Sequence, residues 1–375
     1  MKMKITKIIL LLGSISLFLL SSCHVGRFFV WNFADVKDYK KFPSVPIAKD
    51  SNYVFQFAEP GPDFKMPFNN PRIRIDGKEK PFEEALQKEG TAAFLIIHQD
   101  TIIYEHYFKG FDTASIVPSF SAAKSYVSAL LGIAIEEGFI RSVDDSITRY
   151  IPTLPADPYA KITLRHLLDM RSGLKFNESY VNPFGHVAKS YYGTNLKKFS
   201  ATLKASSGPD DHFSYISVNT QLIGWAIENA TGKKLSQYLE EKIWKPLGME
   251  YSATWSIDSK KHRTEKAFCC LNARARDFAK FGRLFLNKGN WNGAQIISEA
   301  WIAESLDFDE QRFYSYQWWR KPRSEDGGQE DFYANGFLGQ YIYVNPKKSL
   351  IIVRLGKKDG DIYWPRIFQQ ISDQI

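Results

Sequence analysis

The alternation of apolar and polar side chains predicts β-strands near both ends of the folded chain. Residues 91–108 form two apolar runs separated by Gln99 and Asp100, a pattern typical of a β-hairpin. Three further strand-like segments lie near the C-terminus: Tyr314–Arg320, Gln340–Asn345 and Leu350–Leu355. We expect these segments to join in one sheet built from both ends of the chain.

The region between these strands carries apolar residues at helical spacing. The predicted helices are Ser121 to about Gly138, Leu164–Met170, Thr220–Ala230, Leu235–Ile243, Ala273–Leu286 and Ser298–Ser305. Strands at both ends with helices between them indicate an α+β fold, in which an antiparallel sheet is flanked by helices. We expect an all-helical subdomain over about residues 141–260.

The N-terminus is typical of a bacterial lipoprotein. Three lysines lie within residues 1–7, and the apolar segment Ile8–Leu20 is too short to span a bilayer comfortably. The sequence Leu20-Ser-Ser-Cys23 resembles a lipobox, in which the cysteine receives the lipid. We expect a signal peptide over 1–22, lipid on Cys23, a tether and lead-in over 23–60, and the main folded domain over 61–375. An ordinary secretory signal with a chance cysteine is the alternative.

If the lipoprotein interpretation holds, the protein faces the periplasm or the cell surface and contacts the membrane through its lipid. The formal net charge of +8 includes the three lysines of the leader and gives no support for nucleic-acid binding. The seven histidines form no H-x-x-x-H pattern and no C-x-x-C is present, so neither a metal nor an organic cofactor is predicted. Cys269 and Cys270 are predicted to be two buried thiols, because adjacent cysteines form only a strained disulfide.

Ser121 and Lys124 carry the strongest chemical signal, because residues three apart share one face of a helix. A serine hydroxyl needs a base to become a nucleophile, and lysine is such a base only where its pKa is lowered. A serine that caps the helix beside a solvated lysine is the alternative. A second S-x-x-K match at Ser172–Lys175 follows the helix stop Gly173, so its serine and lysine would not share a helical face.

Tyr215 lies in a polar loop that enters a predicted helix, where a phenol can project into a cleft. A tyrosinate stabilised by a neighbouring lysine would take the serine proton and pass it to the leaving group. A packed tyrosine with a satisfied hydroxyl is the alternative.

Taken together, these motifs resemble the class C β-lactamases, esterases and penicillin-binding-protein-like serine hydrolases, in which S-x-x-K marks the nucleophile. The resemblance runs from about Thr91 to the end. The segments that carry it, in order, are Ser121–Lys124, Val143–Ile147, Tyr150–Pro152, Ile162–Gly173, Tyr215–Ser217, Pro246–Met249, Ala273–Gly282 and Gly336–Gln340. Details such as Phe213–Thr220 and the Gly339-Gln340 pair are closer to the 6-aminohexanoate-dimer hydrolase branch.

The resemblance implies that Ser121 is the nucleophile, Lys124 the adjacent base and Tyr215 the proton relay. It places the oxyanion hole at the backbone N–H of Ser121 and one N–H around Gly336-Phe337.

Two departures from the family pattern concern substrate binding. Ser217 stands where the family has asparagine, and Ala334-Asn335-Gly336 stands where it has Lys-Thr-Gly. If Ala334 faces the cleft, the missing lysine removes a contact to substrate carboxylates worth about 1.5–3 kcal/mol.

These residues predict a lipid-anchored hydrolase of a small ester, amide or peptide. A catalytically silent cell-wall-binding or sensing lipoprotein on the same fold is one alternative. A weak β-lactamase or D-Ala peptidase is another. The sequence leaves the substrate, the membrane leaflet and the oligomeric state open.

Overall fold

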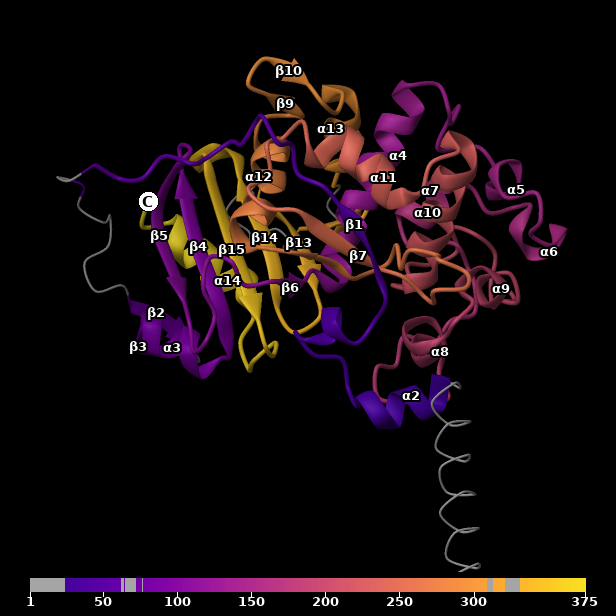
Figure 1. Cartoon of the computed structure of the whole chain (residues 1–375), viewed down its shortest axis with the longest axis horizontal. Coiled ribbons are helices and arrows are strands. Elements are labelled where there is room, and N and C mark those ends of the chain that lie inside the picture. Colours follow the sequence, from indigo (N-terminus) through magenta and orange to yellow (C-terminus); the bar gives the residue numbers. More distant parts are fainter. Residues whose placement is uncertain (1–23, 62–63, 65–71, 76, 309–312, 321–330) are drawn as a thin grey trace, which may run out of the picture.

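A seven-stranded antiparallel sheet runs along one side of the molecule, and most of the helices gather on the other (Figure 1). The computed structural model describes residues 24–61, 64, 72–75, 77–308, 313–320 and 331–375. The large sheet has the spatial order β11 (Tyr314–Ser315), β12 (Trp318–Trp319), β13 (Phe332–Gly336), β14 (Gln340–Asn345), β15 (Leu350–Gly356), β4 (Thr91–His98) and β5 (Thr101–Tyr107). Strands from both ends of the chain therefore pair within this sheet, where β15 meets β4.

Smaller sheets and hairpins surround this sheet. A four-stranded sheet has the order β1 (Ser44–Ile47), β7 (Ala253–Ser256), β8 (Leu271–Ala273) and β6 (Val117–Pro118). Two further hairpins are β2 (Arg72–Ile75) with β3 (Lys78–Pro81), and β9 (Asn290–Trp291) with β10 (Ala294–Gln295).

The helices of the N-terminal half are α2 (His24–Trp31), α3 (Phe82–Lys88), α4 (Ala123–Glu136), α5 (Ile147–Tyr150), α6 (Ala156–Tyr159), α7 (Leu164–Leu168) and α8 (His186–Tyr192). The later ones are α9 (Leu196–Ser200), α10 (Ser217–Thr231), α11 (Leu235–Leu239), α12 (Ala275–Leu286), α13 (Glu299–Ser305) and α14 (Trp364–Ser372). Figure 1 shows α5, α6, α7, α9 and α10 together on the side away from the large sheet.

Both faces of the large sheet are buried at its central strands, which explains why β4, β14 and β15 are mostly apolar. In β4, Leu95 and Ile97 belong to the core shared with α4 and α12, whereas Phe94 and Ile96 belong to the core under α3 and α14. Successive strand residues point to opposite faces, so each strand contributes to both cores. Gly282 lets α12 lie close to the sheet, because a Cβ there would stand 2.9 Å from Ile342.

The structure confirms the predicted fold class and the 91–108 hairpin. It differs from two other expectations. Residues 24–60 do not form a tether: α2 packs beside α8, and β1 pairs with β7. The predicted strand Tyr314–Arg320 is a tight hairpin of two short strands, because Tyr316 and Gln317 adopt positive φ angles of 41° and 70° and reverse the chain.

Candidate active site

Ser121 lies in a short 3-10 turn (Phe120–Ala122) just before α4 begins. The turn is fixed to the small sheet because the Ser119 N–H donates to the Leu271 carbonyl at 2.7 Å. Phe120 has a φ of 44°, a left-handed conformation that is costly for a residue with a β-carbon and is found mostly at functional sites. No side chain caps the start of α4, so the structure does not support the helix-cap alternative for Ser121.

Lys124 is buried beside Ser121, as the helical spacing predicts. Its ammonium nitrogen lies 2.7 Å from Ser121 Oγ, 3.0 Å from the Phe268 carbonyl and 3.4 Å from Ser217 Oγ. Burial disfavours the charged form and lowers the pKa of Lys124 to about 8, although the Glu178 carboxylate opposes the shift. The lowered pKa makes the neutral amine, the form that a general base requires, far more accessible near neutral pH than in an ordinary lysine.

Tyr215 lies just before α10, with its ring 5.0 Å from the Lys124 nitrogen. Burial raises the pKa of the phenol, and the Glu178 carboxylate raises it further, while the Ser121 hydroxyl lowers it. The sequence hypothesis of a resting tyrosinate is therefore not supported, because Tyr215 stays protonated in the free protein. Of these two groups, Lys124 has the pKa suited to a base, and Tyr215 is suited to donate a proton.

Ser217 occupies the first turn of α10 and is bound by a carboxylate that the sequence analysis missed. Glu178 accepts the Ser217 N–H at 2.9 Å and the Ser217 hydroxyl at 2.5 Å. It also accepts the Tyr180 hydroxyl at 3.0 Å. Glu178 lies in a loop whose sequence has no periodic pattern, so its role could not be predicted. The only signal in the sequence was Ser217 itself, whose side chain is shorter than the asparagine of the family and leaves room for another polar group.

Gly336 ends strand β13 against the turn that carries Ser121. A Cβ at Gly336 would lie 2.2 Å from the Ser119 carbonyl oxygen, so the strand approaches this closely only with glycine. The next residue, Phe337, packs edge-to-face on Phe120 with ring centroids 5.8 Å apart. Buried Gln340 donates to the Phe337 carbonyl at 3.1 Å and to the Gly356 carbonyl at 2.7 Å, which fixes the strand end.

Ala334 does not face the cleft, contrary to the expectation from the sequence. It is fully buried, pairs with Ile342 of β14 and belongs to the core between the sheet and α4. Asn335 and Gly336, the last two residues of this strand, line the space beside Ser121. The register of β13 decides whether Ala334 or Asn335 is exposed to substrate, and the sequence alone did not fix it.

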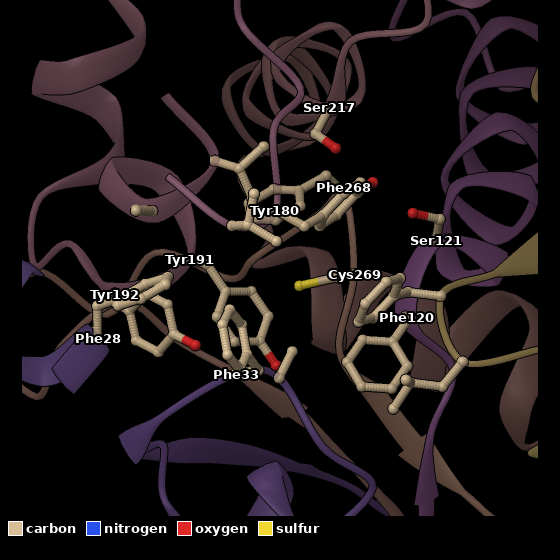
Figure 2. A pocket seen from close by; sticks show the side chains of 16 residues that line it. Phe28, Phe33, Phe120, Ser121, Tyr180, Tyr191, Tyr192, Ser217, Phe268 and Cys269 are labelled. Carbon is tan, nitrogen blue, oxygen red and sulfur yellow. The ribbon is translucent and has the colours of Figure 1, made fainter. Parts of the chain in front are cut away.

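Two compartments meet at Ser121. The larger has a volume of about 340 Å³ and is lined mainly by aromatic and aliphatic side chains (Figure 2). The smaller has a volume of about 170 Å³ and is lined by residues that include Tyr215, Asn335 and Asp359. Tyr180 and Phe337 line both, and their rings stack with centroids 4.9 Å apart. The site thus offers separate spaces for the two sides of a scissile bond.

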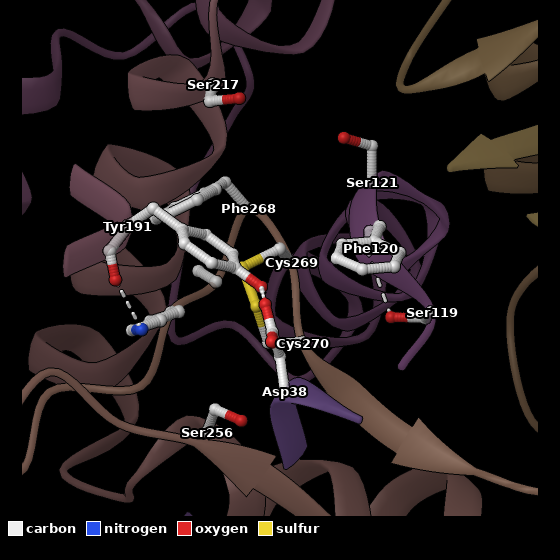
Figure 3. The surroundings of a disulfide bond; sticks show 12 residues. Asp38, Ser119, Phe120, Ser121, Tyr191, Ser217, Ser256, Phe268, Cys269 and Cys270 are labelled. Carbon is white, nitrogen blue, oxygen red and sulfur yellow. Dashed lines mark hydrogen bonds between the residues drawn. A yellow bond between two sulfur atoms is a disulfide. The ribbon is translucent and has the colours of Figure 1, made fainter. Parts of the chain in front are cut away.

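Cys269 and Cys270 form a disulfide, so the prediction of two free thiols is wrong (Figure 3). Cys270 adopts a φ of 71°, a backbone bend that the sequence does not reveal. The pair directly follows Phe268, whose carbonyl holds Lys124, and Cys269 lines the larger compartment. The disulfide therefore belongs to the wall of the site.

The structure also bears on the second S-x-x-K match, on membrane-spanning helices and on metal binding. Ser172, in the second S-x-x-K match, is buried outside α7 and bound to Asn219, as the helix stop predicts. Cys23 lies outside the described residues. In the ranges that the structure describes, no helix is both long and apolar enough to cross a membrane. Among those same residues, no three histidine, cysteine or carboxylate side chains gather in a group suited to a metal ion.

Residues 79–363 match the family model named Beta-lactamase, and the chain belongs to this family. It is therefore a serine hydrolase of the acyl-enzyme class. The 6-aminohexanoate-dimer hydrolase of Paenarthrobacter ureafaciens is 26% identical over 325 residues, which cover 79% of each chain. A solved structure from Bacillus anthracis, whose assignment to the same hydrolase is itself provisional, matches with a TM-score of 0.78 and 25% identity. The match covers 92% of this chain and 94% of that one. These matches confirm the predicted branch.

Proposed function

We propose that this protein hydrolyses an ester or amide bond through an acyl-enzyme on Ser121. The observation that carries the proposal is the 2.7 Å contact between Ser121 and a buried lysine with a pKa of about 8. Neutral Lys124 takes the hydroxyl proton while Ser121 Oγ attacks the substrate carbonyl carbon. The tetrahedral oxyanion lies against the backbone N–H groups of Ser121 and Phe337, donors preorganised by the 3-10 turn and the end of β13.

The proton then travels from Lys124 through the Tyr215 phenol to the departing alcohol or amine, and the carbon–leaving-group bond breaks. In the second half, water attacks the acyl carbon and passes a proton along the same groups to Ser121 Oγ. The bond between Oγ and the acyl group breaks, and the acid is released. Supporting this path, Tyr215 lies beside Lys124, lines the smaller compartment and is protonated in the free protein. The names of the two hydrolase relatives support hydrolysis, and they do not fix the substrate of this chain.

Neutral substrates fit the site better than carboxylate-bearing ones. The residues lining the smaller compartment include Asp359, and the described residues that line the two compartments include no lysine or arginine. Penicillins and peptides ending in D-Ala carry a carboxylate that lacks a cationic partner here. A weak β-lactamase or D-Ala peptidase is therefore the second candidate.

A substrate panel tests this proposal. Purified protein would be assayed on small neutral esters, linear amides, D-amino peptides and a chromogenic cephalosporin, beside Ser121→Ala and the control Ser172→Ala. Turnover of a neutral ester that is lost in Ser121→Ala and kept in Ser172→Ala is the expected result. A panel with no turnover at all would favour the catalytically silent binding protein.

Lipidation of Cys23 and a periplasm-facing or surface location complete the proposal, and both rest on the lipobox-like sequence. Mass spectrometry of the native N-terminal peptide tests them. The expected peptide begins at an acylated Cys23, and an unmodified Cys23 would overturn this part without affecting the catalytic proposal.

A further inference from the structure

The larger compartment is a mainly apolar space with Ser121 among its lining residues. Phe120, Phe268 and Phe337 line it near the serine, and Figure 2 shows Phe28 and Tyr192 on the opposite side. Aliphatic contributions come from Val187 and Ala188 of α8 and from the loop before it. A space of this kind excludes water from a hydrocarbon chain and offers few hydrogen-bonding groups to a polar one.

Exposed apolar side chains lie on α2, just after it and in the loop before α8. We define the apolar collar as Phe29, Val30, Phe33, Val181 and Phe184. The exposed fractions of these side chains are 68%, 61%, 52%, 70% and 67%. The four most exposed large apolar side chains among the described residues all belong to this collar. Phe33 and Val181 also line the compartment, and α2 packs on α8, so collar and compartment are continuous.

The position of the collar in the chain indicates what covers it. The apolar segment Ile8–Leu20 and Cys23 come directly before α2, the helix that carries Phe29 and Val30. The membrane attachment is either the retained segment Ile8–Leu20 or, after its removal, an acyl group on Cys23. In both cases it would lie directly before α2, which carries two residues of the collar. Helix α2 contains no acidic residue, so no negative charge on this helix would repel an anionic lipid surface.

From this juxtaposition we infer that the collar rests on a lipid surface and that the larger compartment takes the acyl chain of an amphiphilic ester drawn from it. The inference rests on the proposed function, whose substrate class it names. The acyl carbonyl lies at Ser121 and the alcohol part in the smaller compartment. Attack by Ser121 transfers the acyl group to Oγ and releases the alcohol with the serine proton. Water then releases the fatty acid and restores the hydroxyl.

Chain-length preference tests the acyl compartment. Values of kcat/KM are measured for 4-nitrophenyl acetate and octanoate below the concentration at which octanoate forms micelles. The octanoate-to-acetate ratio should exceed one in the wild type and fall about tenfold in Val181→Asp, which places a charge at the rim of the compartment. Exposed Phe139, which lines neither compartment, provides the control, and Phe139→Ser should keep the wild-type ratio. A wild-type ratio at or below one would overturn the acyl assignment.

Vesicles of phosphatidylglycerol test the collar. The full chain is used with Cys23→Ser, so that no acyl group is attached to it, and co-sedimentation is compared with and without the double change Phe29→Ser and Val30→Ser. The fraction bound should fall several-fold, and Phe139→Ser should not change it. Equal binding by the collar variant would overturn the docking surface. Acetate turnover that depends on Ser121 would still stand in that case, so failure of this inference differs from failure of the proposed function.

Discussion

The carboxylate of Glu178 accepts both the N–H and the hydroxyl of Ser217, at 2.9 and 2.5 Å. The same carboxylate raises the pKa of Lys124 against the larger lowering by burial. Glu178 thereby contacts Ser217, which replaces the asparagine of the family, and also affects the charge state of Lys124. It orients Ser217 and tunes Lys124 without touching Ser121.

The base assignment predicts a pH dependence. Because Lys124 must be neutral to accept a proton and its pKa is about 8, kcat/KM on a neutral ester should rise with pH and level off above that value. Glu178→Gln removes the charge that opposes the lowering, so the pKa of Lys124 should fall further. The rising limb of the profile should therefore move to lower pH. A profile that stays in place, or moves to higher pH, would contradict this relationship.

Replacement of Lys124 should remove most of the activity. General-base catalysis contributes about 10²–10⁴-fold, so Lys124→Ala should lose a factor in this range on the best ester. Adding Ser121→Ala should cost little more, because nucleophile and base act as a unit and their losses do not add. Single and double variants assayed side by side test this, and additive losses would speak against a shared role.

Tyr215→Phe should impair amide cleavage more than ester cleavage. A departing amine requires a proton, whereas a phenolate leaves with little help. The measurement is the ratio of kcat/KM values on an amide and a nitrophenyl ester with the same acyl group. Equal losses on both substrates would mean that Tyr215 only positions its neighbours.

Gly336→Ala should disturb the site through the backbone. Its Cβ would lie 2.2 Å from the Ser119 carbonyl oxygen, so the strand end or the serine turn must shift. We expect a loss of about 1–3 kcal/mol in the free energy of unfolding, with reduced ester turnover. Urea unfolding measures the first and initial rates the second. Gly61→Ala is the matched control, since its added Cβ meets nothing within 4 Å.

Carboxylate recognition should be restored at Asn335, not at Ala334. Asn335 lines the smaller compartment, whereas a lysine at Ala334 would enter the core. Asn335→Lys should raise kcat/KM for a cephalosporin relative to a neutral ester, and about 1.4 kcal/mol of differential transition-state binding gives a tenfold change. A wild-type preference for cephalosporins would overturn the substrate argument and leave the catalytic one intact.

Local patterns in the sequence predicted most of the fold. The strands of the 91–108 hairpin and helices α4, α10 and α12 have strong periodicity, and each lies close to its expected bounds. The contact between Ser121 and Lys124 was predictable for the same reason, because the 3-10 turn that carries Ser121 runs directly into α4. The hairpin at Tyr316 and Gln317 was not, since neither residue signals a positive φ.

The remaining features of the site depend on long-range contacts. Glu178 reaches Ser217 from a loop 39 residues earlier, and α2 brings Phe28 to a compartment whose other walls lie far along the chain. The disulfide depends on one backbone bend at Cys270, and the orientation of Ala334 depends on strand register. None of these four features produces a periodic pattern in the sequence, so none could be predicted from it.

Covalent trapping tests the catalytic assignment most directly. The intact protein is incubated with an aryl fluorophosphonate and weighed by mass spectrometry, and the modified peptide is then sequenced. We predict a single adduct on Ser121 in the wild type, the same adduct in Ser172→Ala and none in Ser121→Ala. An adduct that persists in Ser121→Ala, or an active wild-type enzyme that remains unlabelled, would contradict the assignment of Ser121 as the nucleophile.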